Sequence, residues 1–263
     1  MTKVVTALLG FGARRALPAR EAYALWAGSY PPVPHNPLMQ TEQAIVAPII
    51  RSTSPRRALD VGTGSGRYLP LLVATGARVV VGVDFSLPML RAGCSGADGR
   101  PGPADAGGAD VSAAGTVPRV CGDACRLPFR DATFDLVSSS LMVGDVADLA
   151  RWVGEVARVT APGGHLVYSD FHPSWATGRW RRTFQTADGR SFEVAYFPHT
   201  IAEHLRVLAD RSFDVRAIRE PRLEARNGAA RLARIGRRPA PVVVVFHAVK
   251  RGPGRPRVAA IRE

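Results

Sequence analysis

The sequence predicts an α/β protein with an open, mostly parallel β-sheet and helices on both faces. From residue 57 onward, short apolar strand patterns alternate with helical patterns. Strands separated by helices in this way pair in parallel. The first strand runs into a tight, glycine-rich turn. Of the 263 residues, 46% are hydrophobic, which is enough for one large domain with a sizeable core.

Residues 1–55 precede this alternation and are predicted to be helical. The stretch 19–51 contains two segments with helical periodicity. Pro31, Pro32 and Pro34 separate them, and such a proline cluster ends one helix before the next begins. We therefore expect two N-terminal helices joined by a turn.

Residues 56–171 form the regular part of the predicted fold. Apolar runs predict strands at 56–62, 77–84, 119–124, 134–141 and 165–171. Helical spacing predicts helices at 67–74, 86–93 and 146–160. Ser86 stands where an N-cap is expected, and Pro162, Gly163 and Gly164 predict a turn. Residues 94–118 are rich in Gly, Ala, Pro and Asp, and this predicts a mobile surface insertion.

The C-terminal part is less regular. Residues 172–199 are rich in aromatic side chains, and the sequence Ala187-Asp188-Gly189 predicts a hairpin turn between two short strands. Residues 200–251 predict a helix at 200–211 and then two strands that complete the sheet. The basic tail at 252–263 is predicted to be disordered.

Composition argues against several classes of protein. No apolar run reaches 18 residues, so no membrane span is expected. The N-terminus lacks the features of a secretory signal, and we expect a cytoplasmic protein. Cys94, Cys121 and Cys125 are too few for a disulfide framework and lack the partners of a zinc site. They are interpreted as reduced thiols, and no metal is expected.

The positive charge is concentrated at the C-terminal end. The formal net charge is +13, and residues 219–263 hold 12 Lys or Arg against 3 Asp or Glu, a surplus of +9. Such a surplus attracts nucleic acid, acidic proteins or anionic metabolites. The favoured interpretation is nevertheless a solvated, arginine-rich surface.

The glycine-rich turn predicts a ligand site. Ligands of open α/β sheets bind at the carboxyl ends of the strands, where this turn lies. Gly62, Gly64 and Gly66 allow positive φ and close approach of a ligand to the backbone. A phosphate-binding loop is excluded because no lysine follows. A dinucleotide site requires a third glycine where this chain has Arg67.

Asp60 followed by G-x-G-x-G resembles motif I of class I S-adenosylmethionine-dependent methyltransferases, of the type-11 kind. The resemblance continues in order along the chain. Asp84 ends the second strand, "GDACRLPF" stands at 122–129, and "FDLVSSSLMVGDV" and "RVTAPGGHLVYSDFHP" resemble the next two strands with their turns. The N-terminal "YALWAGSYPP" resembles a helical lid with a tyrosine that closes over the cofactor.

This resemblance implies a Rossmann-like, seven-stranded sheet with an N-terminal helical lid, and S-adenosyl-L-methionine as cofactor. It implies that Asp84 binds both ribose hydroxyls and that Asp123 meets the adenine amino group beside Ala124. An acid such as Asp60 suits a positively charged sulfonium. A purely structural role in its turn is the alternative for each of these three acids. The full set of expected cofactor-binding residues is Asp60, Gly62, Thr63, Gly64, Gly66, Asp84, Phe85, Asp123, Ala124 and Ser139.

Three residues are candidates for catalysis, namely Asp145, His172 and Tyr30. A base is required only when the acceptor is an alcohol, a phenol or an acidic carbon. Related sequences often carry a histidine where this chain has Asp145, which argues against a histidine base at that position. His172 has a suitable ordinary pKa of ~6.5. A packed loop histidine is the alternative interpretation.

The favoured function is methyl transfer to an O, N or C nucleophile of a small molecule. Arg179, Arg181 and Arg182 near the expected site mouth are compatible with an anionic acceptor or with a solvated edge. One alternative is an RNA or protein methyltransferase that uses the basic C-terminal region, although no separate RNA-binding module is recognisable. A non-catalytic regulator that binds the cofactor is another. We expect a monomer or a homodimer.

Overall fold

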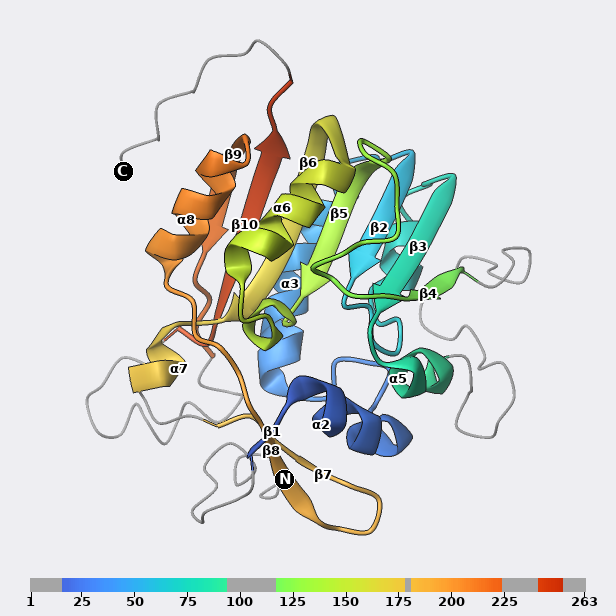
Figure 1. Ribbon diagram of the computed structural model, residues 1–263, viewed down its shortest axis with the longest axis vertical. Helices are drawn as coiled ribbons and strands as arrows, with labels where there is room; N and C mark the ends of the chain where they lie inside the picture. The colour runs from blue at the N-terminus through green and yellow to red at the C-terminus, as the bar shows by residue number, and fades with distance from the viewer. Residues whose placement is uncertain (1–15, 94–116, 178–180, 224–240, 253–263) are drawn as a thin grey trace.

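The computed structural model describes residues 16–93, 117–177, 181–223 and 241–252. Within them lies a seven-stranded sheet in the order β4-β3-β2-β5-β6-β10-β9 (Figure 1). Its strands are β2 (Arg57–Val61), β3 (Val79–Asp84), β4 (Arg119–Cys121), β5 (Phe134–Ser140), β6 (Thr160–Phe171), β9 (Phe213–Arg219) and β10 (Val243–Lys250). The first five strands of this order pair in parallel, and β10 is antiparallel to both of its neighbours. The predicted fold class is confirmed.

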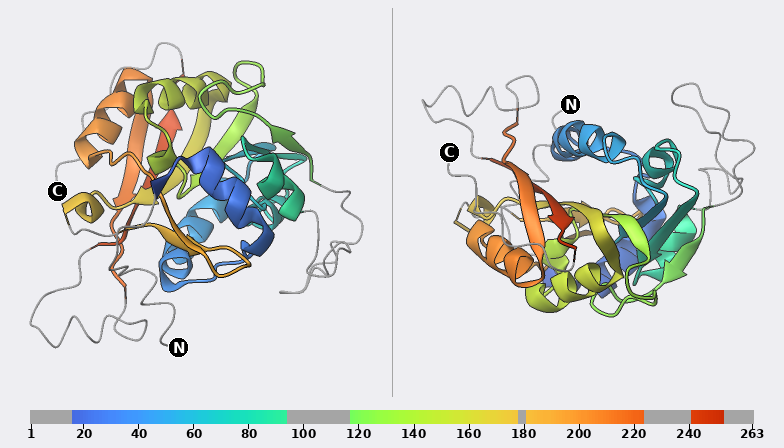
Figure 2. Two further views of the ribbon diagram at one scale, coloured as in Figure 1. Left: turned by 60° about the horizontal axis from the view of Figure 1, so that its bottom comes forward. Right: turned by 90° about the horizontal axis from the view of Figure 1, so that it is seen from above.

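Helices cover both faces of the sheet, as Figure 2 shows in the view from above. Helices α6 (Leu149–Val159) and α8 (Ile201–Asp210) pack on one face, and α3 (Pro37–Arg51) and α4 (Leu69–Val73) pack on the other. Alternation along β2 explains this, because Leu59 and Val61 join the first core while Ala58 joins the second. The parallel strands are thus buried on both sides.

Side-chain caps fix where several helices begin. The Asn36 side chain accepts a hydrogen bond from Met39 N at 2.9 Å at the start of α3, and Asp148 does the same for Arg151 N in α6. Thr200 forms a capping box with Glu203 in α8. Ser86 is the N-cap residue of α5 (Leu87–Ala92), as predicted, but its hydroxyl makes no capping hydrogen bond.

Two strand boundaries differ from the sequence-based expectation. The strand predicted at 119–124 ends at Cys121, because Asp123 Oδ1 accepts the N–H of Cys125 and turns the chain. Strand β6 begins at Thr160, so the turn predicted at Pro162–Gly164 lies inside an irregular part of the strand. The first difference arises from a local hydrogen bond, and the second from pairing of Thr160 with the distant Phe134, neither of which an apolar pattern encodes.

A second, three-stranded sheet lies at the carboxyl ends of the parallel strands. It pairs β1 (Ala16–Leu17) with β8 (Ser191–Val194), and β8 with β7 (Thr183–Gln185). The β7–β8 hairpin turns at Gly189, which has a φ of 82°, and this confirms the predicted hairpin. Helix α2 (Ala19–Trp26), the 3-10 turn η1 (Ala27–Ser29) and α5 lie at the same end of the molecule (Figures 1 and 2).

Helix α7 (Ser174–Thr177) and the 3-10 turn η3 (Val143–Asp145) complete the described elements. The insertion predicted at 94–118 lies almost wholly outside the described residues, as does the tail predicted at 252–263. Among the residues that the structure describes, we find no helix with the length and apolar character needed to cross a membrane.

Candidate active site

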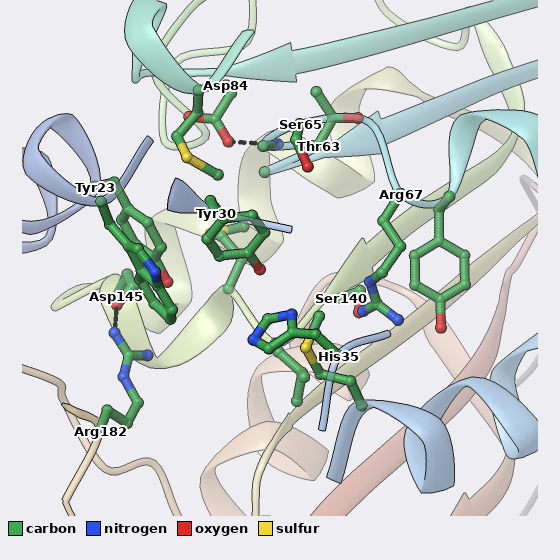
Figure 3. Close-up of a pocket in the computed structure, with 18 of the residues that line it drawn as sticks. Tyr23, Tyr30, His35, Thr63, Ser65, Arg67, Asp84, Ser140, Asp145 and Arg182 are labelled. Atoms are coloured by element: carbon green, nitrogen blue, oxygen red, sulfur yellow. Dashed lines mark hydrogen bonds and ion pairs between the residues drawn. The ribbon is translucent and has the colours of Figure 1, made fainter. Parts of the chain in front are cut away.

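A cavity lies between the carboxyl ends of β2, β3, β5 and β6 and the cover formed by α2, η1 and β7. Figure 3 shows the three groups of residues that define it: the loop after β2 with Asp84, a polar cluster around Arg67, and a pair formed by Asp145 and Arg182. The elements that meet here come from the N-terminal helices, the sheet and the hairpin. The cavity therefore depends on segments far apart in the sequence.

The loop after β2 has the backbone that its glycines predict. Gly62, Gly64 and Gly66 have φ values of 72°, 56° and 90°. A Cβ on Gly62 would lie only 2.4 Å from the Met142 side chain. The space that a side chain at position 62 would occupy is therefore already filled by Met142. Gly66 does not line the cavity, whereas Gly62, Thr63 and Gly64 do.

Asp84 ends β3 with its side chain at the cavity wall. Its two carboxylate oxygens accept the N–H groups of Gly64 and Ser86, each at 2.8 Å. Burial raises the pKa of Asp84, and the two backbone N–H groups act in the opposite direction. A carboxylate has about four lone-pair sites, so about two remain for a ligand. The geometry suits a ligand with two adjacent hydroxyls.

Asp60 is a buried carboxyl that forms no salt bridge with any described residue. Ser138 Oγ donates to its Oδ1 at 2.8 Å. Burial raises the pKa of Asp60 to about 6, against the lowering effects of its hydroxyl neighbours and Arg67. A cationic ligand in the cavity would stabilise the ionised form. The two carboxylates of Asp60 and Asp84, which accept hydrogen bonds and carry negative charge when ionised, thus fit a cationic nucleoside.

Glu42, which sequence reasoning missed, organises the polar side of the cavity. It is fully buried on α3 and accepts four hydrogen bonds. The donors are Arg67 at 3.1 Å, Tyr68 Oη at 2.8 Å, and the hydroxyls of Ser140 and Ser169 at 2.7 Å each. The sequence contained a signal for Glu42. One buried i, i+4 stripe of α3 consists of Leu38, Glu42, Val46 and Ile50, and Glu42 is its only charged member.

Asp145 and Arg182 form an ion pair on the other side of the cavity. Their side chains are 3% and 7% exposed. Burial raises the pKa of Asp145, while Arg182 and the phenol of Tyr23 act in the opposite direction. The guanidinium also lies over the ring of Phe171, 5.1 Å from its centre. This pair connects η3 to the start of β7.

Aromatic rings form the cover of the cavity. Trp26 stacks on Phe184 of β7 with ring centres 4.9 Å apart, and Tyr30 meets Trp26 edge-on at 4.8 Å. His35 lies 5.6 Å from Tyr30. Burial raises the pKa of Tyr30, so its phenol stays protonated and can donate a hydrogen bond.

The structure brings together Asp60, Gly62, Thr63, Gly64, Asp84, Phe85, Tyr30 and Asp145 at the cavity. Ser139 is buried but does not line it, and its neighbour Ser140 takes that position. Asp123 bonds the N–H of Cys125, and Ala124 packs on the core.

His172 also lies outside the cavity wall. Its ring nitrogens bond Ser174 Oγ at 2.9 Å and Glu220 at 2.8 Å. Of the arginines expected near the mouth, Arg181 pairs with Glu193 on the surface and Arg179 lies outside the described residues. Of the two described arginines in this group, Arg182 lines the cavity and Arg181 does not. No group of three or more His, Cys, Asp or Glu residues suited to a metal occurs in the described parts of the chain.

Comparisons with known proteins agree with this geometry. A family model described as a methyltransferase domain matches residues 59–168. A demethylmenaquinone methyltransferase from Mycolicibacterium gilvum is 37% identical over 115 residues. That alignment covers 44% of this chain and 42% of the relative. The chain thus matches about half, or less, of the length of its curated relatives.

Solved structures share the fold. An S-adenosylmethionine-dependent methyltransferase from Mesorhizobium loti is 22% identical, with a TM-score of 0.55 over 77% of this chain and 96% of that one. The N-methyltransferase NodS from Bradyrhizobium japonicum, in complex with S-adenosyl-L-homocysteine, is 11% identical, with a TM-score of 0.55 over 82% of this chain and 89% of that one. Residues 59–168 therefore match a methyltransferase domain, and the chain shares the fold of solved S-adenosylmethionine-dependent methyltransferases.

Proposed function

We propose that this chain transfers the methyl group of S-adenosyl-L-methionine to an oxygen, nitrogen or carbon nucleophile of a small molecule, as a cytoplasmic enzyme. The observation that carries the proposal is Asp84. Its carboxylate is oriented by Gly64 and Ser86 and keeps lone pairs for two hydroxyls, which suits a ribose. The matched family domain contains this residue.

Asp60 supports the same cofactor. When bound, S-adenosyl-L-methionine supplies an electrophilic methyl group on a positively charged sulfur. The buried carboxyl of Asp60 has no cation in contact among the described residues, and a positive ligand would stabilise its ionised form. The chain's own contribution is mainly to bind, orient and exclude water, because alignment of reacting atoms accounts for much of the rate enhancement in such displacements.

The cover over the cavity supports a small acceptor. Trp26 and Tyr30 line the cavity and Trp26 stacks on Phe184, so an aromatic cover lies over the site, which favours a small acceptor over a folded macromolecule. The curated relatives are named for demethylmenaquinone, itself a small molecule. We assign Asp145 and Tyr30 to the acceptor side, and we leave His172 out because it does not line the cavity.

A turnover assay tests the proposal. The purified chain is incubated with methyl-labelled S-adenosyl-L-methionine and a small-molecule extract, and S-adenosylhomocysteine is quantified. We expect release that depends on the extract and is lost in Asp84→Asn. The variant Asp188→Asn, in the exposed hairpin turn, is the control and should match the wild type. Cofactor binding without release on any extract would instead support the non-catalytic regulator.

A further inference from the structure

Arg182 leaves one of its terminal nitrogens without a hydrogen-bond partner at the cavity wall. Its Nη2 bonds the Asp145 carboxylate, and its Nη1 is buried with no partner among the described residues. Figure 3 shows that second nitrogen directed away from Asp145, toward the interior of the cavity. Buried N–H groups are almost always satisfied in native proteins. An oxygen of a ligand in the cavity would satisfy this nitrogen.

Asp145, beside Arg182, provides hydrogen-bond acceptors. A carboxylate accepts about four hydrogen bonds. Arg182 and Tyr23 account for two of them. Arg182 and Asp145 thus present a cationic donor and an anionic acceptor next to one another, and both line the cavity.

We infer that Arg182 and Asp145 form the acceptor subsite of this methyltransferase and that they select an acidic hydroxyl, that of a phenol or an enol. The inference rests on the proposed function. The hydroxyl donates its hydrogen bond to Asp145 and accepts one from Arg182 Nη1. It thereby satisfies both groups at once, which neither an ether nor a hydrocarbon can do.

Other acceptor classes fit the pair less well. A neutral amine has one lone pair, which attack on the methyl carbon requires, so it has none left for Arg182. A carboxylate brings no proton and would place a second negative charge against Asp145. An aliphatic alcohol holds its proton too tightly for a carboxylate base, whereas a phenol such as that of tyrosine releases it near pH ~10.

In the transfer step, Asp145 takes up the proton and Arg182 stabilises the negative charge. The O–H bond of the acceptor breaks and its proton passes to Asp145, while Arg182 stabilises the oxyanion. The released electron pair, on the oxygen or on the conjugated carbon, forms the bond to the methyl carbon as the bond from that carbon to sulfur breaks. The sulfur leaves as a neutral thioether, and Asp145 later returns its proton to water.

Matched probes test the inference directly. Binding of 4-nitrophenol and of its methyl ether, 4-nitroanisole, is measured by calorimetry on the full chain saturated with S-adenosylhomocysteine. We expect the phenol to bind about tenfold more tightly than the ether, because only the phenol can donate a charge-assisted hydrogen bond to the Asp145 carboxylate, whereas both oxygens can accept one from Arg182. Asp145→Asn should strongly reduce that preference, because a neutral amide oxygen is a weaker acceptor than a carboxylate, and Arg182→Gln should weaken the binding of both probes.

Arg181→Gln is the control, since it removes the same charge from the neighbouring exposed residue. It should retain the full preference for the phenol. Equal binding of the two probes by the wild type, or no binding of 4-nitrophenol at millimolar concentration, would overturn the inference. The wild-type comparison decides the question even if Arg182→Gln does not fold. Failure of S-adenosylhomocysteine itself to bind would instead refute the proposed function.

Discussion

The carboxylate of Glu42, on helix α3, holds the guanidinium of Arg67 at 3.1 Å immediately behind the glycine loop. Arg67 stands where a dinucleotide-binding loop would have its third glycine. Its side chain lies over the ring of Tyr68, with its central carbon 4.5 Å from the ring centre. The N-terminal helices are thereby connected to the ends of β5 and β6, and we expect this connection to dominate the stability of the site.

Replacing Glu42 by Ala is expected to destabilise the fold by about 3–5 kcal/mol, because it leaves a buried cation and three hydroxyls without their acceptor. Urea unfolding measures the loss. Gln40→Ala, at an exposed position of the same helix, is the control and should change the free energy of unfolding by less than about 0.5 kcal/mol. A loss at Glu42 no larger than at Gln40 would contradict the assigned network.

Replacing Gly62 by Ala is expected to cost more than replacing Gly76 by Ala. Both residues have positive φ, at 72° and 81°, so both substitutions carry a similar backbone strain. Only at Gly62 does a Cβ meet another side chain, that of Met142 at 2.4 Å. The difference in unfolding free energy should be about 1–3 kcal/mol, as for overpacking in a core. Equal losses for the two variants would show that Met142 moves aside freely.

Burial raises the pKa of Asp170 to about 7. In the unfolded chain an aspartate titrates near ~3.9. The unfolded state therefore loses its proton at lower pH than the folded state, so the stability that this group contributes is present below pH ~4 and is lost as the pH rises to about 7. Asp170→Asn should gain stability relative to the wild type across that window, on the order of 4 kcal/mol in total.

Urea unfolding of both proteins between pH ~4 and pH ~8 measures this difference. The asparagine retains an oxygen for the N–H groups of Gly144 and Phe171, which the Asp170 carboxylate accepts at 3.1 and 2.8 Å. A difference between variant and wild type that does not change with pH would mean that Asp170 titrates normally.

Cofactor affinity is expected to fall below pH ~6 because of Asp60. Burial raises its pKa to about 6, and a cationic ligand favours the ionised form, so binding below that pH must release a proton. Asp84 also has a pKa raised by burial and acts in the same direction. Titrations of S-adenosyl-L-methionine into Asp60→Asn separate the contribution of Asp60 to the pH dependence from that of Asp84. The variant should bind the cofactor more weakly at pH ~8 and show a smaller pH dependence of its affinity. An unchanged pH profile would exclude Asp60 from contact with the cofactor's charge.

Much of the fold was predictable because the strands are short and apolar and because a glycine turn follows the first of them. Asp60, Gly62, Thr63, Gly64 and Asp84 lie at strand ends, and parallel topology alone brings such residues to one edge. The position of Asp145 after β5 follows from the same rule.

The rest of the site depends on contacts between distant segments, which spacing does not reveal. Glu42 meets Ser169 across 127 positions, and Arg182 meets Asp145 only because the β7–β8 hairpin folds back over the sheet. His172 follows the expected strand, yet its ring bonds Glu220 and does not line the cavity. Side-chain direction after a strand end is set by such partners and not by the apolar pattern.

The central claim, that Asp84 and the loop after β2 bind the cofactor, is tested most directly by calorimetric titration with S-adenosylhomocysteine. We expect saturable binding of one molecule per chain, weakened about tenfold or more in Asp84→Asn and unchanged in the exposed control Asp188→Asn. Heats that remain at the level of dilution up to millimolar ligand, or an Asp84→Asn variant that binds as tightly as the wild type, would contradict the account.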